Sequence, residues 1–260
     1  MDKKICVKMK KPSFLDWNSN ILASSLKKID LNIFLIVFLD GLFYLLSGYA
    51  VVFWLQRVQE KMAGFSVPAD IMSLGAEAAS QLAGEVKKFY YLIIFSLILL
   101  LMAIIFLASI LKGIIWARTT GTRITSSLIS RFFILNLMWM GFWFIALFLV
   151  AYLAERTAAP AVLFFLSALA LYLTNTLYAI FMKEQKFKSI LSAIKLNFSK
   201  LHLFALPYAL AGLLFYVVVK LSTLLKFMYS AVLLGLVSLI YVAAARYYIS
   251  ALVFEIEGKK

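Results

Sequence analysis

The chain has 260 residues, of which 64% are hydrophobic, and its mean hydropathy is +0.96. Several apolar runs exceed the roughly 20 residues that an α-helix needs to cross a bilayer, which excludes a water-soluble domain and predicts a polytopic membrane protein. The formal net charge is +14, but the 26 lysines and arginines are concentrated in particular loops. Membrane topology explains that distribution, and we expect no nucleic-acid partner.

The small number of cysteines and histidines excludes an intramolecular disulfide and a Cys/His metal site. Cys6 is the single cysteine, so an intramolecular disulfide cannot form. Because His202 is the single histidine, a Cys/His metal site cannot be assembled either. The sequence offers His202 no catalytic partner, and we expect no catalytic residues, metal or cofactor.

The first thirty residues are predicted to form a cationic tail and a short interfacial helix. Five lysines precede Pro12, and Ser13 and Asp16 have the spacing of a capping box at a helix start. Apolar side chains then recur at helical spacing before two further lysines. We therefore divide the chain into residues 1–30 and a six-helix transmembrane domain, residues 31–260.

Six apolar segments in the second part are long enough to cross a bilayer. They cover residues 31–55, 89–111, 132–153, 161–182, 203–219 and 227–245. Because the first is as long as a span, we expect it to remain as a transmembrane helix and not to be cleaved as a signal peptide. Between the first two spans, Pro68 and the apolar spacing that follows it predict a helix leading into the second span.

The basic residues predict the orientation of these spans. If both termini and the loops 112–131 and 183–202 face the cytoplasm, 19 of the 26 basic residues lie there and 7 lie opposite. The cytoplasmic residues comprise seven before residue 31, four and five in the two loops, and three from Arg246 onward. The positive-inside rule then predicts a multi-pass protein of the cell membrane with cytoplasmic N- and C-termini.

A lysine-rich amphipathic segment lies just before the fifth span. Its large apolar side chains follow one another by three or four residues: Phe187, Ile190, Leu191, Ile194, Phe198 and Leu201. Lys188, Ser192, Lys195 and Ser199 lie on the opposite face. Such a helix is expected to lie at the membrane interface, with Lys186, Lys188, Lys195 and Lys200 in contact with anionic lipid head groups.

Three segments, which begin at Ile21, Ile124 and Ile190, are weakly similar to one another. Each is a short serine-bearing amphipathic stretch that leads into two spans. Either the chain consists of three helical-hairpin repeats, or the segments share only a topology. The predicted fold is all-α, with six transmembrane helices and short cytoplasmic interfacial amphipathic helices.

A short motif occurs in residues 183–210. Glu184 precedes a predicted helix that carries Ala193, Ile194, Lys195, Asn197 and Phe198, and a span follows. This arrangement resembles the glycerophosphodiester phosphodiesterase membrane-domain family and related six-helix membrane proteins of bacteria and archaea. In that family the membrane domain is at most an appendage to a soluble catalytic domain, and we expect no such domain in this chain. The resemblance therefore implies a membrane fold and little chemistry.

Four polar residues are predicted to form one intramembrane cluster. Asp40 lies inside the first span, roughly 13 Å from its cytoplasmic end. Asn136, Asn175 and Arg246 are expected at a similar level, and we predict that Asp40 and Arg246 pair. The cluster has three interpretations: a proton- or solute-binding site, a structural tie between helices, or separate residues, with Asp40 protonated or facing water and Arg246 ending the last span.

Three functions compete at this point. The first is a non-enzymatic scaffold or accessory subunit that has a protein partner in a membrane complex and contacts anionic lipid. The second is a small-solute transporter or channel that uses Asp40, Asn136 and Asn175. The third is a lipid-handling membrane enzyme, which the scarcity of buried acidic and histidine side chains disfavours. We favour the first because the sequence contains no recognisable catalytic group.

Overall fold

The computed structural model describes residues 14–64, 76–155, 157–224 and 230–258. Eight helices occupy these ranges, and no strand is present in them. The all-α prediction is confirmed. In chain order the helices are α1 (Phe14–Lys27), α2 (Asn32–Ala63), α3 (Ala76–Thr120), α4 (Ser126–Leu153), α5 (Ala159–Glu184), α6 (Ser189–Ser199), α7 (Leu201–Leu224) and α8 (Ser230–Gly258).

Six of the helices in the described ranges, α2, α3, α4, α5, α7 and α8, are long and apolar enough to cross a membrane. This confirms the predicted number of spans and indicates a multi-pass membrane protein. Helix α2 has 32 residues and α3 has 45. At 1.5 Å per residue they are about 48 and 67 Å long, so both exceed the roughly 30 Å hydrocarbon core of a bilayer.

The chain forms two compact units. The first unit comprises Met1–Val37, Trp116–Arg123 and Ala161–Lys260, and the second comprises Phe38–Ile115 and Ile124–Pro160. Each unit is described separately below.

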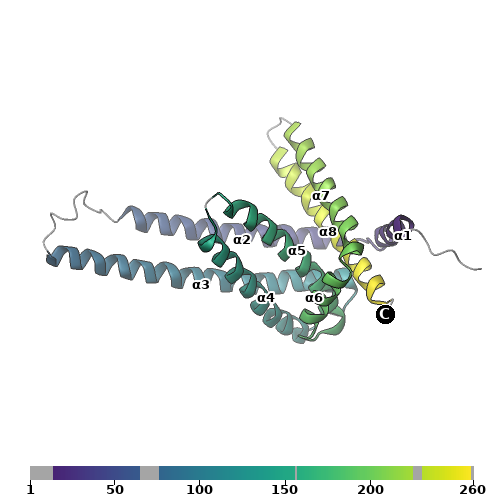
Figure 1. Cartoon of the computed structure of the whole chain (residues 1–260), viewed down its shortest axis with the longest axis horizontal. Coiled ribbons are helices and arrows are strands. Elements are labelled where there is room, and N and C mark those ends of the chain that lie inside the picture. Colours follow the sequence, from purple (N-terminus) through teal and green to yellow (C-terminus); the bar gives the residue numbers. More distant parts are fainter. Residues whose placement is uncertain (1–13, 65–75, 156, 225–229, 259–260) are drawn as a thin grey trace, which may run out of the picture. The chain divides into compact units, whose positions relative to one another are not determined.

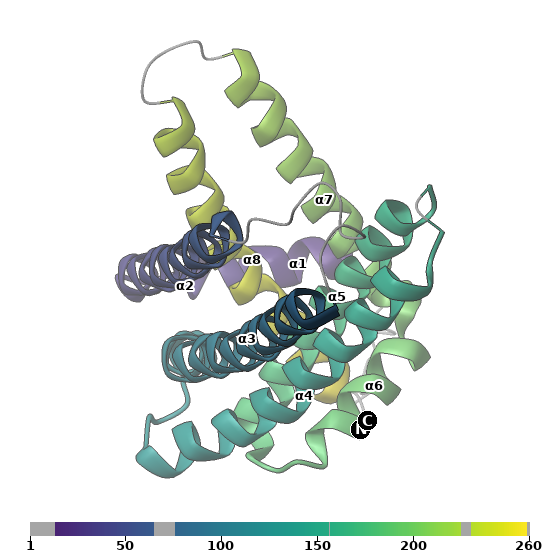
Figure 2. The ribbon, with the colours of Figure 1, turned by 90° about the vertical axis from the view of Figure 1, so that its left-hand side faces the viewer.

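The second unit contains most of α2, most of α3 and all of α4. Helices α2 and α3 run side by side (Figures 1 and 2), and Trp54 Nε1 of α2 donates a hydrogen bond of 3.0 Å to Ser96 Oγ of α3. Helix α4 packs on α3 through an edge-to-face contact between Phe106 and Phe133. Thr125 caps α4 by accepting a hydrogen bond from the Leu128 amide.

One predicted boundary in this unit is wrong. The second span was predicted to end at residue 111, and the basic, acid-free residues 112–131 were predicted to form a loop. Helix α3 instead continues to Thr120, and α4 begins at Ser126. The helix can continue because the Lys112 ammonium is paired with a carboxylate and because apolar residues follow it, of which Ile115 is fully buried.

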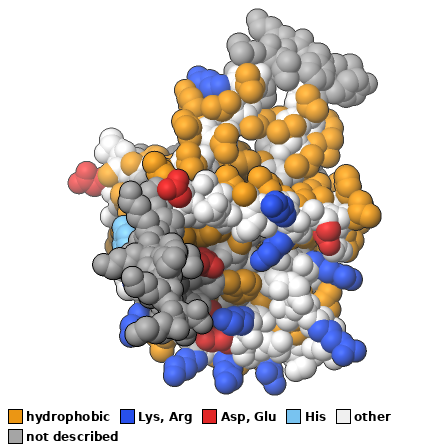
Figure 3. All heavy atoms as spheres, turned by 90° about the vertical axis from the view of Figure 1, so that its right-hand side faces the viewer, with side chains coloured by type: hydrophobic (Ala, Val, Ile, Leu, Met, Phe, Trp, Pro, Cys, Tyr) orange, Lys and Arg blue, Asp and Glu red, His pale blue; other side chains and the backbone are white. Residues whose placement is uncertain are grey.

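The first unit contains α1, α5, α6, α7 and α8. Helices α7 and α8 form a hairpin (Figure 1), in which Tyr241 OH donates to the Ala211 carbonyl at 2.6 Å. Hydrophobic side chains cover much of this hairpin at the top of Figure 3. Leu213 of α7 and Ile240 of α8, for example, are 59% and 51% exposed, as expected for side chains that face lipid.

Helix α1 packs against α8 in the same unit. Its buried residues are Asn18, Ile21 and Ser25, and Asn18 Oδ1 accepts a hydrogen bond of 3.2 Å from Tyr248 OH. Leu15 and Leu26 are 67% and 54% exposed. The helix therefore meets the protein with a face of two polar residues and one isoleucine, and it turns other large apolar side chains outward.

The order of the described helices agrees with the predicted three-hairpin repeat in two of the three segments. Helix α1 precedes the hairpin α2–α3, and α6 precedes the hairpin α7–α8. In the middle segment the chain enters α4 directly at Ser126, with no separate short helix. The triplication stays a prediction, as does the cytoplasmic interfacial position of the amphipathic helices.

Candidate functional site

Helix α6 packs into the first unit with a face that the hydrophobic pattern did not identify. Its buried residues are Ser189, Ala193, Leu196 and Asn197. They are spaced by three, four or one residues and so share one side of the helix. Apart from Leu196, these side chains are small or polar, which allows α6 to approach its neighbours closely.

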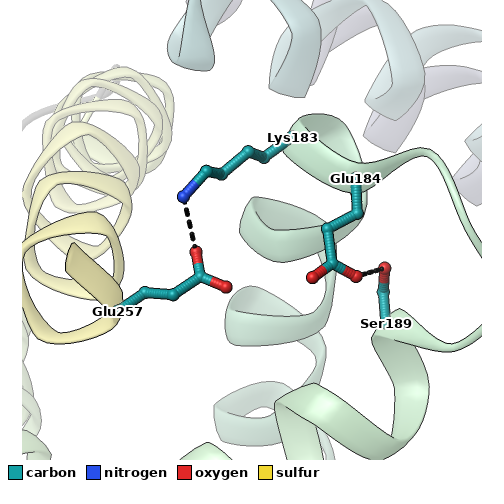
Figure 4. Close-up of polar contacts among 4 residues, drawn as sticks. All are labelled: Lys183, Glu184, Ser189 and Glu257. Atoms are coloured by element: carbon teal, nitrogen blue, oxygen red, sulfur yellow. Dashed lines mark hydrogen bonds and ion pairs between the residues drawn. The ribbon is translucent and has the colours of Figure 1, made fainter. Parts of the chain in front are cut away.

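Two side-chain contacts fix this face along α5. Ser189 Oγ donates to Glu184 Oε2 at 2.8 Å (Figure 4), and Thr176 Oγ1 donates to Asn197 Oδ1 at 2.8 Å. The contacts are eight residues apart on each helix, which corresponds to about 12 Å of helix axis. Helix α6 therefore folds back along the last turns of α5.

The remaining sides of α6 face outward. Phe187, just before the helix, and Leu191 and Phe198 within it are 42%, 69% and 63% exposed, so the predicted apolar stripe is present but is not the face that packs on the protein. The four lysines predicted to contact lipid, Lys186, Lys188, Lys195 and Lys200, are all exposed. Their contact with anionic lipid stays a prediction.

A group of hydroxyl and amide side chains joins α5, α6 and α7. Tyr172 OH donates to the Asn197 main-chain carbonyl at 3.1 Å, and the Tyr172 and Tyr208 rings meet edge to face at 4.9 Å. The hydroxyl of Tyr208 donates a hydrogen bond of 3.4 Å to the Tyr172 main-chain carbonyl, which joins α7 to α5. Asn175, a predicted member of the four-residue cluster, lies on α5 three residues after Tyr172.

The ends of α5 and α8 are joined at the surface of the first unit. Lys183 Nζ lies 3.0 Å from Glu257 Oε2 (Figure 4), and the same ammonium lies 5.8 Å from the centre of the Phe254 ring. The Lys183 side chain is 53% exposed. An ion pair so open to solvent contributes about 0–1 kcal/mol to stability. It orients the two helix ends more than it stabilises them.

Asp40 lies in the second unit and is fully buried. Its Oδ1 atom is 2.5 Å from Lys112 Nζ, and the Lys112 side chain is only 13% exposed. The ammonium also lies 4.6 Å from the ring centres of Phe43 and Tyr44. Carboxylate and aromatic faces together satisfy a charge that apolar surroundings would otherwise disfavour. Sequence reasoning missed Lys112 because it assigned this lysine to a loop.

Asn136 lies on α4 and contacts α3 about one helical turn from Lys112. Its Nδ2 atom donates to Ser109 Oγ at 3.0 Å, and both side chains are fully buried. Ser109 precedes Lys112 by three residues. Asp40 of α2 and Asn136 of α4 therefore contact neighbouring turns of α3. Asn175 and the buried Arg246 belong to the first unit. The cluster of all four residues and the pairing of Asp40 with Arg246 stay predictions.

Within the described ranges, His, Cys, Asp and Glu side chains do not gather in groups of three or more that could hold a metal ion. In the described ranges the first unit offers hydrogen-bonding side chains and exposed lysines around α6, and the second unit offers the buried Asp40–Lys112 ion pair. The chain matches no protein-family model, no curated protein and no solved structure.

Proposed function

We propose that this protein is a non-enzymatic integral membrane protein that serves as a scaffold or accessory subunit of a membrane complex. In this proposal it lies in the cell membrane with both termini in the cytoplasm. Helix α6 rests on the cytoplasmic surface, where its lysines contact anionic head groups.

The arrangement of α6 is the observation that supports this function best. Its small polar face is used within the protein, through Ser189 and Asn197. Its large apolar side chains and its lysines remain outside, with Leu191 at 69% exposure. A helix with an exposed apolar stripe beside exposed cations has the character of an interfacial helix.

The charge of α6 adds to this interpretation. A lysine near an anionic leaflet gains about 1 kcal/mol, so the four exposed lysines together supply an attraction on the order of 4 kcal/mol. Fixing α6 along α5 presents these charges as one group and not as a mobile tail. Such a surface would hold the protein, and any subunit bound to it, at lipid of negative charge.

The test of the scaffold function is extraction of the tagged protein from its native membrane in polymer-bounded lipid discs. This extraction retains lipids and neighbouring subunits. We expect a second polypeptide at a fixed molar ratio to the tagged chain, identified by mass spectrometry. A different tagged six-span protein from the same membrane serves as the control and should not carry that polypeptide. Recovery of the tagged protein as a lone chain would contradict the proposal.

A further inference from the structure

Helices α1 and α6 are the two short helices of the described ranges, and the order of the elements puts both on one side of the membrane. Each precedes a helix that is long and apolar enough to cross, α2 after α1 and α7 after α6. Between them the chain runs through α2, α3, α4 and α5. When each of these four helices crosses once, the chain returns to the side from which it started. The two short helices then belong to the same leaflet.

Helix α1 has an apolar side next to the side that packs on α8. Leu15, Leu22 and Leu26 are 67%, 42% and 54% exposed. They are spaced by seven and four residues, so they lie in one line along the helix. The following side is polar, is exposed and carries a single charge; its residues are Asp16, Ser19, Asn20 and Ser24. With so little charge, α1 is attracted to a bilayer mainly through its leucines.

Helix α6 also turns an apolar side away from the protein. Leu191 and Phe198 are seven residues apart and share one side of the helix, and they are 69% and 63% exposed. On other sides, the side chains of Asn197 in α6 and Asn18 in α1 accept hydrogen bonds from α5 and α8. These contacts limit the rotation of each helix about its own axis. The apolar sides therefore keep a fixed direction relative to the neighbouring spans.

The positions of the two helices along the chain indicate that lipid covers these apolar sides. Helix α6 ends at Ser199 and α7 begins at Leu201, whereas α1 ends at Lys27 and α2 begins at Asn32. Connections this short keep each helix at the level where the next span enters the head groups. An amphipathic helix at that level buries its apolar side about 5–10 Å into the boundary between head groups and acyl chains.

Insertion to that depth expands only one leaflet. Helices α1 and α6 have 14 and 11 residues, so they are about 21 and 16 Å long. With a helix diameter of about 10 Å, together they add roughly 370 Å² at the head-group level. The hydrocarbon core is about 30 Å thick, so the opposite leaflet lies below their reach. A bilayer relieves such a difference in area by bending until the expanded leaflet is convex.

We propose that α1 and α6 act as a pair of wedges that make the protein prefer membrane whose α6-side leaflet is convex. In such a leaflet the head groups are spread, and the gaps between them expose acyl chains to the leucines and phenylalanine of the two helices. This inference rests on the interfacial position of α6 in the proposed function. It adds the kind of lipid surface that the protein recognises, which is set by shape and apolar insertion as well as by charge.

The test uses the purified full-length chain in giant vesicles of phosphatidylcholine and phosphatidylglycerol. After reconstitution, an impermeant fluorescent maleimide labels Cys6, the single cysteine, only in chains whose N-terminus faces outward. In these chains α1 and α6 lie in the outer leaflet, which becomes convex on a thin tube pulled outward from the vesicle. We expect a higher ratio of protein to lipid-dye fluorescence on the tube than on the vesicle. Equal ratios would overturn the proposal.

One variant removes the wedges and leaves the helices intact. Glutamine replaces the four most exposed apolar side chains of α1 and α6: Leu15, Leu26, Leu191 and Phe198. Because these side chains do not pack on the protein and glutamine is a good helix former, far-ultraviolet circular dichroism should match the wild type. The enrichment on the tube should be lost, and the changes in α1 alone or in α6 alone should each remove part of it. Enrichment equal to that of the wild type would overturn the proposal.

The matched control changes Lys186, Lys188, Lys195 and Lys200 to Gln, which alters the charge of α6 but not the inserted apolar volume. This variant should retain the enrichment on the tube. Loss of enrichment here, with retention in the apolar variant, would assign the effect to charge and overturn the proposal. Failure of the scaffold function shows separately, as a lone chain after extraction, and leaves the tube measurement unchanged.

A second copy of the chain is the competing occupant of the apolar sides. Photobleaching of the labelled protein on flat membrane distinguishes the two occupants. Lipid as the occupant predicts the same number of bleaching steps in the wild type and in the apolar variant. Two steps in the wild type and one in the variant would show that the apolar sides join two chains, and would overturn the proposal.

Discussion

At the scale of single residues, the main feature is the buried ion pair between Asp40 and Lys112. Asp40 is fully buried, and the Lys112 side chain is 13% exposed, so bulk water contributes little to the solvation of either charge. Removal of one member leaves the other uncompensated, whereas removal of both costs much less. The pair therefore matters less for its net stabilising energy than for the penalty that follows if it is broken.

The first prediction is a double-mutant cycle on this pair. Asp40→Ala and Lys112→Ala should each lower the free energy of unfolding by about 3 kcal/mol, because each strands a buried charge. The double variant should lose much less than the sum of the two single losses. The measurement is the unfolding of the detergent-solubilised protein by increasing amounts of sodium dodecyl sulfate. Additive losses would show that the two side chains do not interact.

A second cycle with Arg246→Ala tests the partner that the sequence predicted. Arg246 is buried, so its loss alone should also lower stability. Coupling of Arg246 to Asp40 as large as that of Lys112 would show that the carboxylate serves both cations. The two cycles share the Asp40→Ala variant, so the coupling free energies of Asp40 with Lys112 and with Arg246 can be compared directly.

Sequence reasoning located the buried acid but not the lysine bound to it. Asp40 was identifiable because a carboxylate within an apolar run is rare. Lys112 lies at the end of such a run, where a lysine normally reaches the head groups, and this made a loop the better interpretation. The available signal was the apolar sequence after it, which includes the buried Ile115 and Trp116.

At the scale of the element, the close approach of α3 and α4 depends on Gly113. A Cβ atom on this residue would lie 3.0 Å from Ile129 Cδ1 and 3.2 Å from Phe132 Cδ1. Phe132 is fully buried and has little room to move. The glycine therefore sets the distance between the two helices, as small residues do in membrane helix packing.

The corresponding prediction compares two glycines of the second unit. Gly113→Val should lower the free energy of unfolding by about 1–3 kcal/mol, because two more methyl groups extend from a Cβ that is already too close to α4. Gly48→Val is the matched control, since its added Cβ meets no heavy atom of the described chain within 4 Å apart from its chain neighbours and its own helix backbone. Equal losses in the two variants would mean that helix propensity, and not packing, decides the effect.

The elements also show why α6 was only half predictable. Periodicity identifies large apolar side chains, and it found the stripe that contains Leu191 and Phe198. It gives little weight to serine, alanine and asparagine, which form the buried face. Whether an apolar stripe packs on protein or faces lipid is not encoded in its spacing, because hydrocarbon and a protein core are equally apolar.

For the whole molecule, six helices in the described ranges are long and apolar enough to cross a membrane, and the predicted topology in which each crosses once puts both termini on one side. Single cysteines at Ser66, Ala158 and Ser192 in a Cys6→Ser variant test the orientation. An impermeant thiol reagent applied outside intact cells should label positions 66 and 158 and leave 192 unlabelled, since the basic residues favour a cytoplasmic 183–202 segment. Labelling at 192 without labelling at 66 would invert the topology.

The most direct test of the central claim concerns the lipids around α6. Changing Lys186, Lys188, Lys195 and Lys200 together to Gln should reduce the enrichment of phosphatidylglycerol over phosphatidylcholine that native mass spectrometry detects on the purified protein. Each lysine contributes about 1 kcal/mol of attraction at an anionic surface. The matched control changes four exposed lysines predicted to lie on the opposite side of the membrane, Lys61, Lys87, Lys88 and Lys220. The control variant should retain the enrichment of the wild type, whereas equal enrichment in both variants and the wild type would contradict the account.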